Sequence, residues 1–325
     1  MASTWRSAFP GLAVAATVAV AAMFLSEHYH ASAMLFALLL GMSLNFLSQE
    51  GKCVEGIQLS ATSVLRVGIA LLGLRISFAQ VADLGLATAG LIALSVLATI
   101  AIGVLLARIC ALNARFGVLT GGAVAICGAS AALAIAAVLP RHADSDRDTS
   151  FAVIGVTALS TIAMIAYPVV VGALGLDQHD SGVFLGGTIH DVAQVVGAGY
   201  GMSKETGDTA TIVKLLRVAM LLPVVFLVSL IARRSAIDRR TTPLLPMFGV
   251  AFFVLVIVNS LGWVPRALGE VAGELSRWCL VAAIAAIGMK TSLKELSVVG
   301  LRPVVLMVLQ TAALAGLVAA FILVK

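Results

Sequence analysis

Charged residues are scarce in this sequence of 325 residues: Asp, Glu, Lys and Arg together make up 11% of it, against about a quarter of an ordinary globular chain. Hydrophobic residues make up 61%. Too few charges are present to cover the surface of a soluble domain of this length, so the composition excludes a soluble fold.

Other features are missing as well. The most charged loops, 141–148 and 233–240, are too short to hold a soluble domain. The P-loop pattern of nucleotide-driven pumps does not occur. Paired cysteine spacing, which would indicate a disulfide framework or a zinc site, is absent from the four cysteines, which are Cys53, Cys110, Cys127 and Cys279. We expect no metal and no cofactor.

Long apolar runs such as 86–106 are continuous, whereas the strands of a membrane β-barrel would alternate over about ten residues. They predict an all-α, polytopic membrane helical bundle of about 10 to 11 transmembrane helices in one domain, 1–325, of the cell membrane. The candidate spans are 9–25, 31–47, 58–74, 86–106, 117–139, 151–175, 183–200, 210–231, 245–263, 272–288 and 301–323.

The positive charges give an orientation. When each span is counted as one crossing, eleven Lys and Arg residues fall on the side of the N-terminus and six on the other side. The positive-inside rule therefore predicts a cytoplasmic N-terminus, and one re-entrant segment would invert everything after it. A net charge of +5 is ordinary for such a protein and does not indicate a nucleic-acid partner.

An internal repeat connects two distant parts of the chain. Residues 73–77 (GLRIS) match residues 288–292 (GMKTS), and Asn45 falls near Asn259 when the alignment is extended. Spans two to four thus resemble spans nine to eleven, in repeat-like halves of roughly 31–175 and 183–325. The odd separation of the copies predicts opposite orientations, which is the inverted-repeat architecture of many secondary transporters.

A small-residue segment, 120–130, breaks the pattern of ordinary spans. Its glycines allow a helix to unwind or another backbone to approach, and its hydroxyl groups can bind freed backbone groups or a ligand. Tight helix packing through small residues is the alternative. The candidate residues are Gly121, Gly122, Gly128, Cys127 and Ser130.

A second segment, 186–201, carries polar residues inside an apolar run. Asp191 is the only acidic residue well inside a candidate span, where a carboxylate must face a cavity, find a partner or carry a proton. Capping of a half-helix is its alternative role. The other candidates here are Thr188, His190, Gln194 and the glycines Gly186, Gly187 and Gly197.

Span eight contains Lys214 and Arg217, three residues apart and thus on one helix face. Either they point inward, where they could pair with Asp191 or attract an anion, or they snorkel to the membrane surface. Arg66, in span three, is a weaker candidate, which we keep as a gate.

The motif GGTIHDVAQVVGA at 186–198, with LGLR at 72–75 and KLLRV at 214–218, resembles the bacterial sulfate exporter family over nearly the whole chain. That family is grouped with the bile-acid, arsenite and riboflavin transporters, so the resemblance implies inverted repeats and two discontinuous crossing helices, here at 121–130 and 186–199. Counted as simple crossings, these two segments run in the same direction, yet the crossing helices of an inverted repeat should oppose. Either one span is re-entrant or the second repeat is circularly permuted.

Together these features predict a secondary transporter, not an enzyme, that moves a small anion by alternating access. Sulfate, sulfite or an organosulfur anion is the first substrate class, export the expected direction, and a gradient of H⁺ or Na⁺ the energy source. Asp191 and His190 would handle the coupling proton, Gln194, Ser130 and Thr188 would bind substrate, and the two cations would attract it.

Two other functions stay open. In a cation/proton antiporter, Asp191 would bind Na⁺ or H⁺ and the cations would only balance its charge. An intramembrane enzyme using His190 with Asp191, or Cys127, has the weakest support because no nucleophile, base and orienting group share a local motif. The expected partners are the anion, the coupling ion, the lipid bilayer and, as a candidate, a second copy of the chain in a homodimer.

Overall fold

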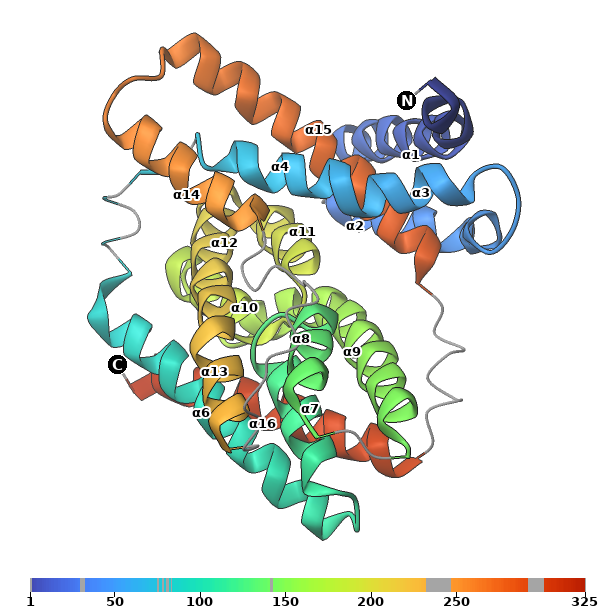
Figure 1. Cartoon of the computed structure of the whole chain (residues 1–325). Helices are drawn as coiled ribbons and strands as arrows, with labels where there is room; N and C mark the ends of the chain where they lie inside the picture. Colours follow the sequence, from blue (N-terminus) through green and yellow to red (C-terminus); the bar gives the residue numbers. More distant parts are fainter. Residues whose placement is uncertain are drawn as a thin grey trace. The chain divides into compact units, whose positions relative to one another are not determined.

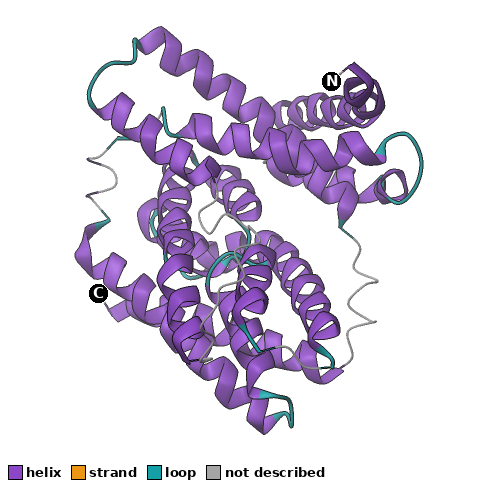
Figure 2. Cartoon of the chain, in the orientation of Figure 1, coloured by secondary structure: helices purple, strands orange, loops and turns teal. Residues whose placement is uncertain are grey.

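The computed structural model describes residues 2–29, 33–74, 76, 77, 79, 82, 84–140, 143–231, 247–291 and 301–324. Within these ranges the protein is built from helices joined by short loops, and no strand occurs in them (Figure 2). The prediction of an all-α fold is therefore confirmed.

The helices follow one another along the chain in the order drawn in Figure 1. They are α1 (Ala2–Tyr29), α2 (Ala33–Ser43), η1 (Asn45–Ser48), α3 (Val54–Leu59), η2 (Ser60–Val64), α4 (Leu65–Leu72), α6 (Gly85–Ile109), α7 (Ala114–Ala125), α8 (Ala129–Val138), α9 (Ser145–Ala173), α10 (Gln178–Thr188), α11 (Val192–Met202), α12 (Lys204–Ala219), α13 (Leu221–Ile231), α14 (Met247–Ser260), α15 (Arg266–Lys290) and α16 (Leu301–Val324).

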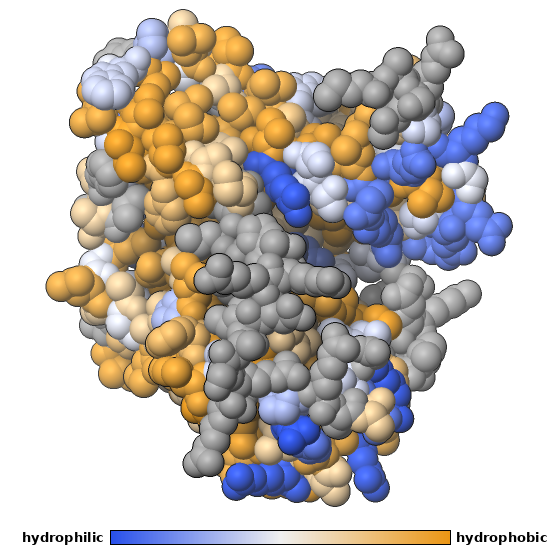
Figure 3. All heavy atoms as spheres, in the orientation of Figure 1, coloured by the Kyte–Doolittle hydropathy of each residue, from blue (hydrophilic) through white to orange (hydrophobic). Residues whose placement is uncertain are grey.

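Seven helices of the described chain are long and apolar enough to cross a membrane. Their outer faces carry large apolar side chains, such as Leu86 with 92% of its surface exposed, and hydrophobic residues cover much of the surface visible in Figure 3. Such exposure would be unstable in water and suits contact with lipid. The seven spans are Ser7–Tyr29, Val54–Leu72, Gly85–Ile109, Arg147–Ala173, Lys204–Ile231, Ala267–Lys290 and Leu301–Val324.

The other four predicted spans have shorter helices. Spans 31–47 and 245–263 contain α2 and α14, whereas 117–139 and 183–200 each contain two half-helices separated by a break. The two discontinuous helices expected at 121–130 and 186–199 therefore lie where the small-residue and polar motifs placed them.

The described residues form two compact units. Unit 1 comprises residues 1–83, 196–208 and 246–292, and unit 2 comprises 84–195, 209–245 and 293–325. Each unit takes segments from both repeat-like halves.

Unit 1 shows the internal repeat as matched contacts. The Asn45 side-chain amide donates to the carbonyl oxygen of Thr291 (3.3 Å), and Asn259 donates to that of Ile76 (3.1 Å). The two bonds are equivalent in the repeat, because Asn45 corresponds to Asn259 at an offset of 214 residues and Ile76 to Thr291 at an offset of 215. The two copies therefore pack against each other through equivalent bonds.

Unit 1 also contains two places where a glycine lies against the backbone of another helix, and these two places are equivalent in the repeat. A β-carbon at Gly73 would lie 2.3 Å from the carbonyl oxygen of Phe252, and one at Gly288 would lie 2.4 Å from that of Leu38. Gly73 corresponds to Gly288 and Leu38 to Phe252 in the repeat. These positions tolerate only glycine because the facing backbones are in contact.

Candidate functional site

The first break lies entirely within unit 2. Helix α7 runs from Ala114 to Ala125 and is capped at its start by Asn113, whose side chain accepts a hydrogen bond from the Arg115 backbone N–H (3.0 Å). Gly128 adopts a φ of 66°, a left-handed conformation that a residue with a β-carbon rarely takes. The chain therefore turns at residues 126–128 before α8 begins.

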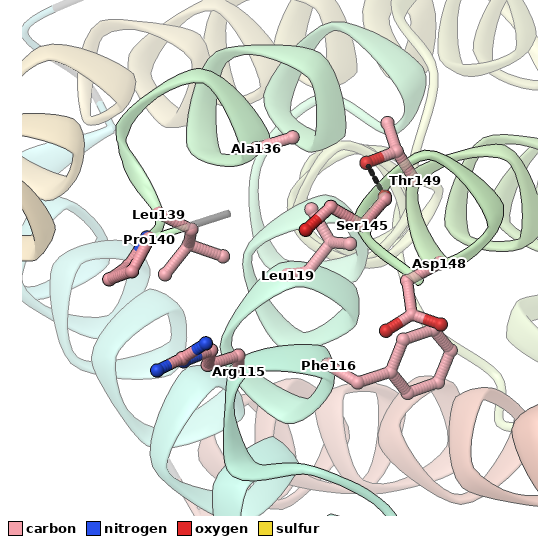
Figure 4. Close-up of a pocket in the computed structure, with 9 residues that line it drawn as sticks. All are labelled: Arg115, Phe116, Leu119, Ala136, Leu139, Pro140, Ser145, Asp148 and Thr149. Atoms are coloured by element: carbon pink, nitrogen blue, oxygen red, sulfur yellow. Dashed lines mark hydrogen bonds between the residues drawn. The ribbon is translucent and has the colours of Figure 1, made fainter. Parts of the chain in front are cut away.

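Helices α7 and α8 fold back on each other. A β-carbon at Gly122 would lie 2.1 Å from Cδ1 of Ile135, although 13 residues of continuous helix would separate two residues by about 20 Å. At the other end, Arg115 and Leu119 line the same pocket as Leu139 (Figure 4). We call residues 114–138 the first hairpin, residues 126–128 its turn, and the end near Arg115 and Leu139 its open end.

The second break, at residues 189–191, separates α10 from α11. Helix α10 is capped at its start by Asp177, which accepts a hydrogen bond from the Asp180 backbone N–H (2.7 Å). Asp191 caps α11 in the same way, because its Oδ2 accepts from the Ala193 N–H (3.0 Å). The backbone N–H of Asp191 donates to Oγ of Ser160 on α9 (3.0 Å). Asp191 is half-buried, and its bond to the Ala193 N–H gives it the capping role considered from the sequence.

Lys214 is fully buried and connects the two breaks. Its Nζ donates to the carbonyl oxygen of Ile126 (2.5 Å) and to that of Ile189 (2.9 Å). Snorkelling to the membrane surface is excluded for a side chain in this position. No carboxylate oxygen of the described residues lies within 4.0 Å of this ammonium group, so the ion pair with Asp191 considered from the sequence does not form.

Arg217 is also fully buried and connects the same breaks through more bonds. Its Nε and Nη2 donate to the Ala125 carbonyl (2.8 and 2.5 Å), and its Nη2 also donates to that of Val124 (2.9 Å). Its Nη1 donates to the carbonyls of Gly186 (3.1 Å) and Ile189 (3.4 Å). These acceptors are the last carbonyls of α7 and α10, which have no partner within their own helices.

The cation pair therefore neutralises two helix C-termini, where the helix dipole is negative. The sequence suggested that the charged groups of Lys214 and Arg217 are free to attract a ligand directly. In the described structure they are instead bonded to backbone carbonyls. The pair instead holds the turn of the first hairpin against the break after α10. A β-carbon at Gly128 would lie 3.8 Å from the carbonyl oxygen of His190, which shows how close the two breaks are.

His190 is fully buried, and both ring nitrogens have partners. Nδ1 lies 3.1 Å from the Val124 carbonyl and Nε2 lies 3.1 Å from Oγ1 of Thr311 on α16. Because a carbonyl only accepts, Nδ1 carries the proton, and in the neutral ring Nε2 accepts from the threonine hydroxyl. His190 thus shares the Val124 carbonyl with Arg217, an arrangement suited to a neutral ring.

Gln194 is the polar side chain here that lacks a full set of partners. Its Nε2 donates to Oγ1 of Thr161 on α9 (2.8 Å). Its Oε1 is buried and has no hydrogen-bond partner among the described residues. A buried acceptor without a donor is costly, so Oε1 marks a place where a bound group would find an acceptor.

The remaining predicted residues separate into buried and accessible ones. Thr188 is buried and donates to the Phe184 carbonyl of its own helix (2.6 Å), so its hydroxyl is occupied locally. Cys127 is buried in the turn of the first hairpin, whereas Ser130 is exposed in the first turn of α8. Arg66 is exposed on α4 in unit 1.

The glycines have a different role from the one predicted. Of the six candidate glycines, Gly128 lies in a break, whereas Gly122 and Gly187 lie in regular helix. Gly186 lets α10 approach α12, since a β-carbon there would lie 2.4 Å from the Ala210 carbonyl. Gly121 and Gly197 are buried within α7 and α11.

Two sets of groups were not predicted from the sequence: the three hydroxyl groups that bind Asp191, Gln194 and His190, and the backbone carbonyls that accept from the two buried cations. Ser160 binds Asp191, Thr161 binds Gln194, and Thr311 binds His190. Adjacent hydroxyl residues inside the apolar run of α9 were a usable signal. The carbonyl acceptors could not be found from the sequence, because every residue has a backbone carbonyl group.

Comparisons with known proteins agree with a membrane location. Residues 10–307 match the family model described as conserved hypothetical protein 698. A UPF0324 membrane protein of Chlorobaculum tepidum is 57% identical over 95% of this chain and 88% of its own length. The UPF0324 membrane protein TauZ of Paracoccus denitrificans is 54% identical over 95% of this chain and 93% of its own length. A UPF0324 membrane protein of Haemophilus influenzae is 33% identical over 94% of this chain and 93% of its own length.

Proposed function

We propose that this chain, which belongs to the UPF0324 membrane protein family, is a secondary transporter of a small anion. Sulfate, sulfite or an organosulfur anion is the substrate class that we put first, with export as the direction and an ion gradient as the energy source. The observation that carries the proposal is the meeting of two helix breaks at Lys214 and Arg217.

Irregular backbone is expensive at membrane depth and is tolerated only where protein or a water-filled cavity surrounds it. Discontinuous helices in the middle of a bundle are typical of the substrate and ion sites of secondary transporters. Here two breaks lie side by side, and two fully buried cations satisfy their carbonyls. A purely structural membrane protein has no need for such an arrangement.

The charge balance of the site favours an anion. Each helix end carries about half an elementary charge, so the two C-termini of α7 and α10 cancel the two N-termini of α8 and α11. Lys214, Arg217 and Asp191 then set the balance, which is about one positive charge. One monovalent anion would neutralise it, and a divalent anion such as sulfate would do so together with one monovalent cation.

The start of α8 offers the most accessible donors for such an anion. Its N-cap is Gly128, which has no side chain to accept from the first backbone N–H groups, and the exposed Ser130 adds a hydroxyl. Backbone amides at a helix N-terminus bind anions well. We therefore assign substrate binding to the first turn of α8, with Ser130 as a contact.

The start of α11 suits the coupling ion. Asp191 contributes a carboxylate there, and the unpartnered Oε1 of Gln194 lies one turn further on the same helix face. A monovalent cation or a proton would satisfy both groups. This pair is also the specific observation that favours the second candidate function, a cation/proton antiporter.

Flux measurements on the purified protein in proteoliposomes separate the two functions. Labelled sulfate, labelled sulfite and ²²Na⁺ are followed in matched vesicles under imposed pH and sodium gradients. An anion transporter moves a labelled anion, and its Na⁺ or H⁺ flux requires that anion. Cation exchange that proceeds equally well without either anion would instead establish the antiporter and overturn the proposal.

A further inference from the structure

The path of α9 defines two sides of unit 2. Helix α9 begins beside the open end of the first hairpin, where Ser145 and Thr149 line the pocket with Arg115 (Figure 4). Halfway along, Ser160 accepts a hydrogen bond from Asp191 in the second break, and Thr161 accepts one from Gln194 in the first turn of α11. The helix then continues for twelve residues to Ala173, about 18 Å at 1.5 Å per residue. Its C-terminal end is therefore on the side away from the open end.

The long helix formed by α12 and α13 runs the opposite way. It begins at Lys204 and reaches the two breaks at Lys214 and Arg217. Beyond them α13 packs against α8, which leads from the turn of the first hairpin to its open end. Within unit 2 this helix begins at Thr209, five residues and about 7 Å before Lys214, and this end of it is therefore on the side away from the open end.

From these two paths we infer that α10 and α11 form a second re-entrant hairpin, residues 178–202, which opens on the membrane side opposite to the first. In unit 2 the chain enters this segment from the far end of α9 and returns at Thr209 of α12, so the segment begins and ends on one side. Its turn, residues 189–191, meets the turn of the first hairpin at Lys214 and Arg217.

The distribution of positive charge supports this topology independently. Seventeen Lys and Arg residues lie outside or at the ends of the eleven spans predicted from the sequence. When 117–139 and 183–200 are re-entrant and the other nine spans cross, 13 of them fall on the side of the N-terminus and four on the other. With only the first hairpin re-entrant the division would be nine against eight, which gives no orientation. The four residues on the other side are Arg75, Lys204, Arg266 and Lys325.

The topology makes each hairpin a barrier on one side of the site. The first hairpin opens to the cytoplasm and the second to the outside, and Arg217 binds carbonyls of both. If the protein is the transporter proposed above, the two hairpins are the two gates of alternating access. Loss of the Arg217 bonds to one hairpin would free that hairpin alone. The topology itself does not depend on transport.

Cysteine labelling of the full chain in intact cells tests the topology. The background carries Cys53, Cys110 and Cys279 as Ser and Cys127 as Ala, and single cysteines replace exposed residues. If Cys127→Ala prevents insertion, the native Cys127 is kept, because it is only 6% exposed, and its own labelling is subtracted. The substitutions are Arg115→Cys and Asp144→Cys at the first open end, and Gln178→Cys and Lys204→Cys at the second.

The inference predicts that an impermeant maleimide added outside labels Gln178→Cys and Lys204→Cys, and that Arg115→Cys and Asp144→Cys react only after permeabilisation. Labelling of Gln178→Cys and Lys204→Cys from different sides would show that α10 and α11 cross the membrane. Labelling of all four from one side, or with the sides exchanged, would also overturn the inference. None of these outcomes depends on flux, so a failure here is distinguishable from a failure of the proposed function.

Discussion

Arg217 donates two hydrogen bonds, of 2.8 and 2.5 Å, to the carbonyl oxygen of Ala125, the last residue of α7. The same guanidinium also binds the Gly186 carbonyl of α10 (3.1 Å). One buried side chain on α12 thus holds two interrupted helices together. Lysine could not replace it, because only the planar, forked guanidinium reaches acceptors in several directions at once.

Replacing Arg217 tests this stabilising role. Arg217→Gln removes bonds from a charged donor, each contributing about 1.5–3 kcal/mol, and leaves buried carbonyls unpaired. We expect the free energy of unfolding to fall by about 3 kcal/mol or more, seen as a lower Tm in detergent. The matched control is Arg277→Gln, because Arg277 is about half-exposed beside Glu274 and its loss should cost about 0.5 kcal/mol or less. Equal Tm values for the two variants would contradict the role of Arg217.

Asp191→Asn separates charge from capping. Asparagine also caps helices well, so the bond to the Ala193 N–H (3.0 Å) should persist and the protein should insert and keep its Tm. Removal of the negative charge should abolish coupled transport, measured as the loss of pH- or sodium-driven anion flux. Asp180→Asn, near the start of α10, is the control. Full flux by Asp191→Asn with unchanged dependence on the gradient would rule out a coupling role.

Gln194 provides a test of the unpartnered acceptor. In Gln194→Met, the Oε1 that has no partner in the described structure disappears, along with the bond to Thr161. Thr161→Val is the control, because it removes that bond and keeps Oε1. We expect Gln194→Met to raise the coupling-ion concentration needed for half-maximal flux at least tenfold, and Thr161→Val to change it much less. Similar values for both variants would assign Gln194 a purely structural role.

The close approach inside the first hairpin predicts a compensating pair of substitutions. Gly122→Ala places a methyl group against Cδ1 of Ile135, 2.1 Å away before any adjustment, and overpacking of this kind costs about 1–3 kcal/mol. Ile135→Val removes that atom. We therefore expect Gly122→Ala to lower Tm and the double variant to recover most of the loss, as a double-mutant cycle would show. Additive losses would mean that α7 and α8 do not face each other at these residues.

The sequence located the breaks and the buried charges because each contrasts with its surroundings. Asp191, Lys214 and Arg217 are isolated charges in apolar runs, and Gly128 interrupts a helix of small residues. The contacts of Asn45 and Asn259 in unit 1 agree with the repeat that was read from a short motif.

The fold-back of the first hairpin could not be predicted from hydrophobicity. Two half-helices of 12 and 10 residues have the same total length and composition as one crossing of about 20 residues. The partners of the cations were hidden for a related reason, since backbone carbonyls leave no mark in the sequence. The conflict between the parallel direction of the two broken segments and an inverted repeat was the one available clue. This conflict disappears if the two hairpins open on opposite sides of the membrane. The first hairpin then follows its repeat copy in the chain, whereas the second hairpin precedes its own.

Uptake of labelled sulfate and sulfite into proteoliposomes under a pH or sodium gradient shows directly whether the protein is an ion-coupled anion transporter. We expect saturable anion flux that follows the gradient, needs no ATP and is lost in Asp191→Asn while the variant protein remains folded. Absence of gradient-driven flux of these or organosulfur anions by folded wild-type protein, or flux that Asp191→Asn leaves intact, would contradict this expectation.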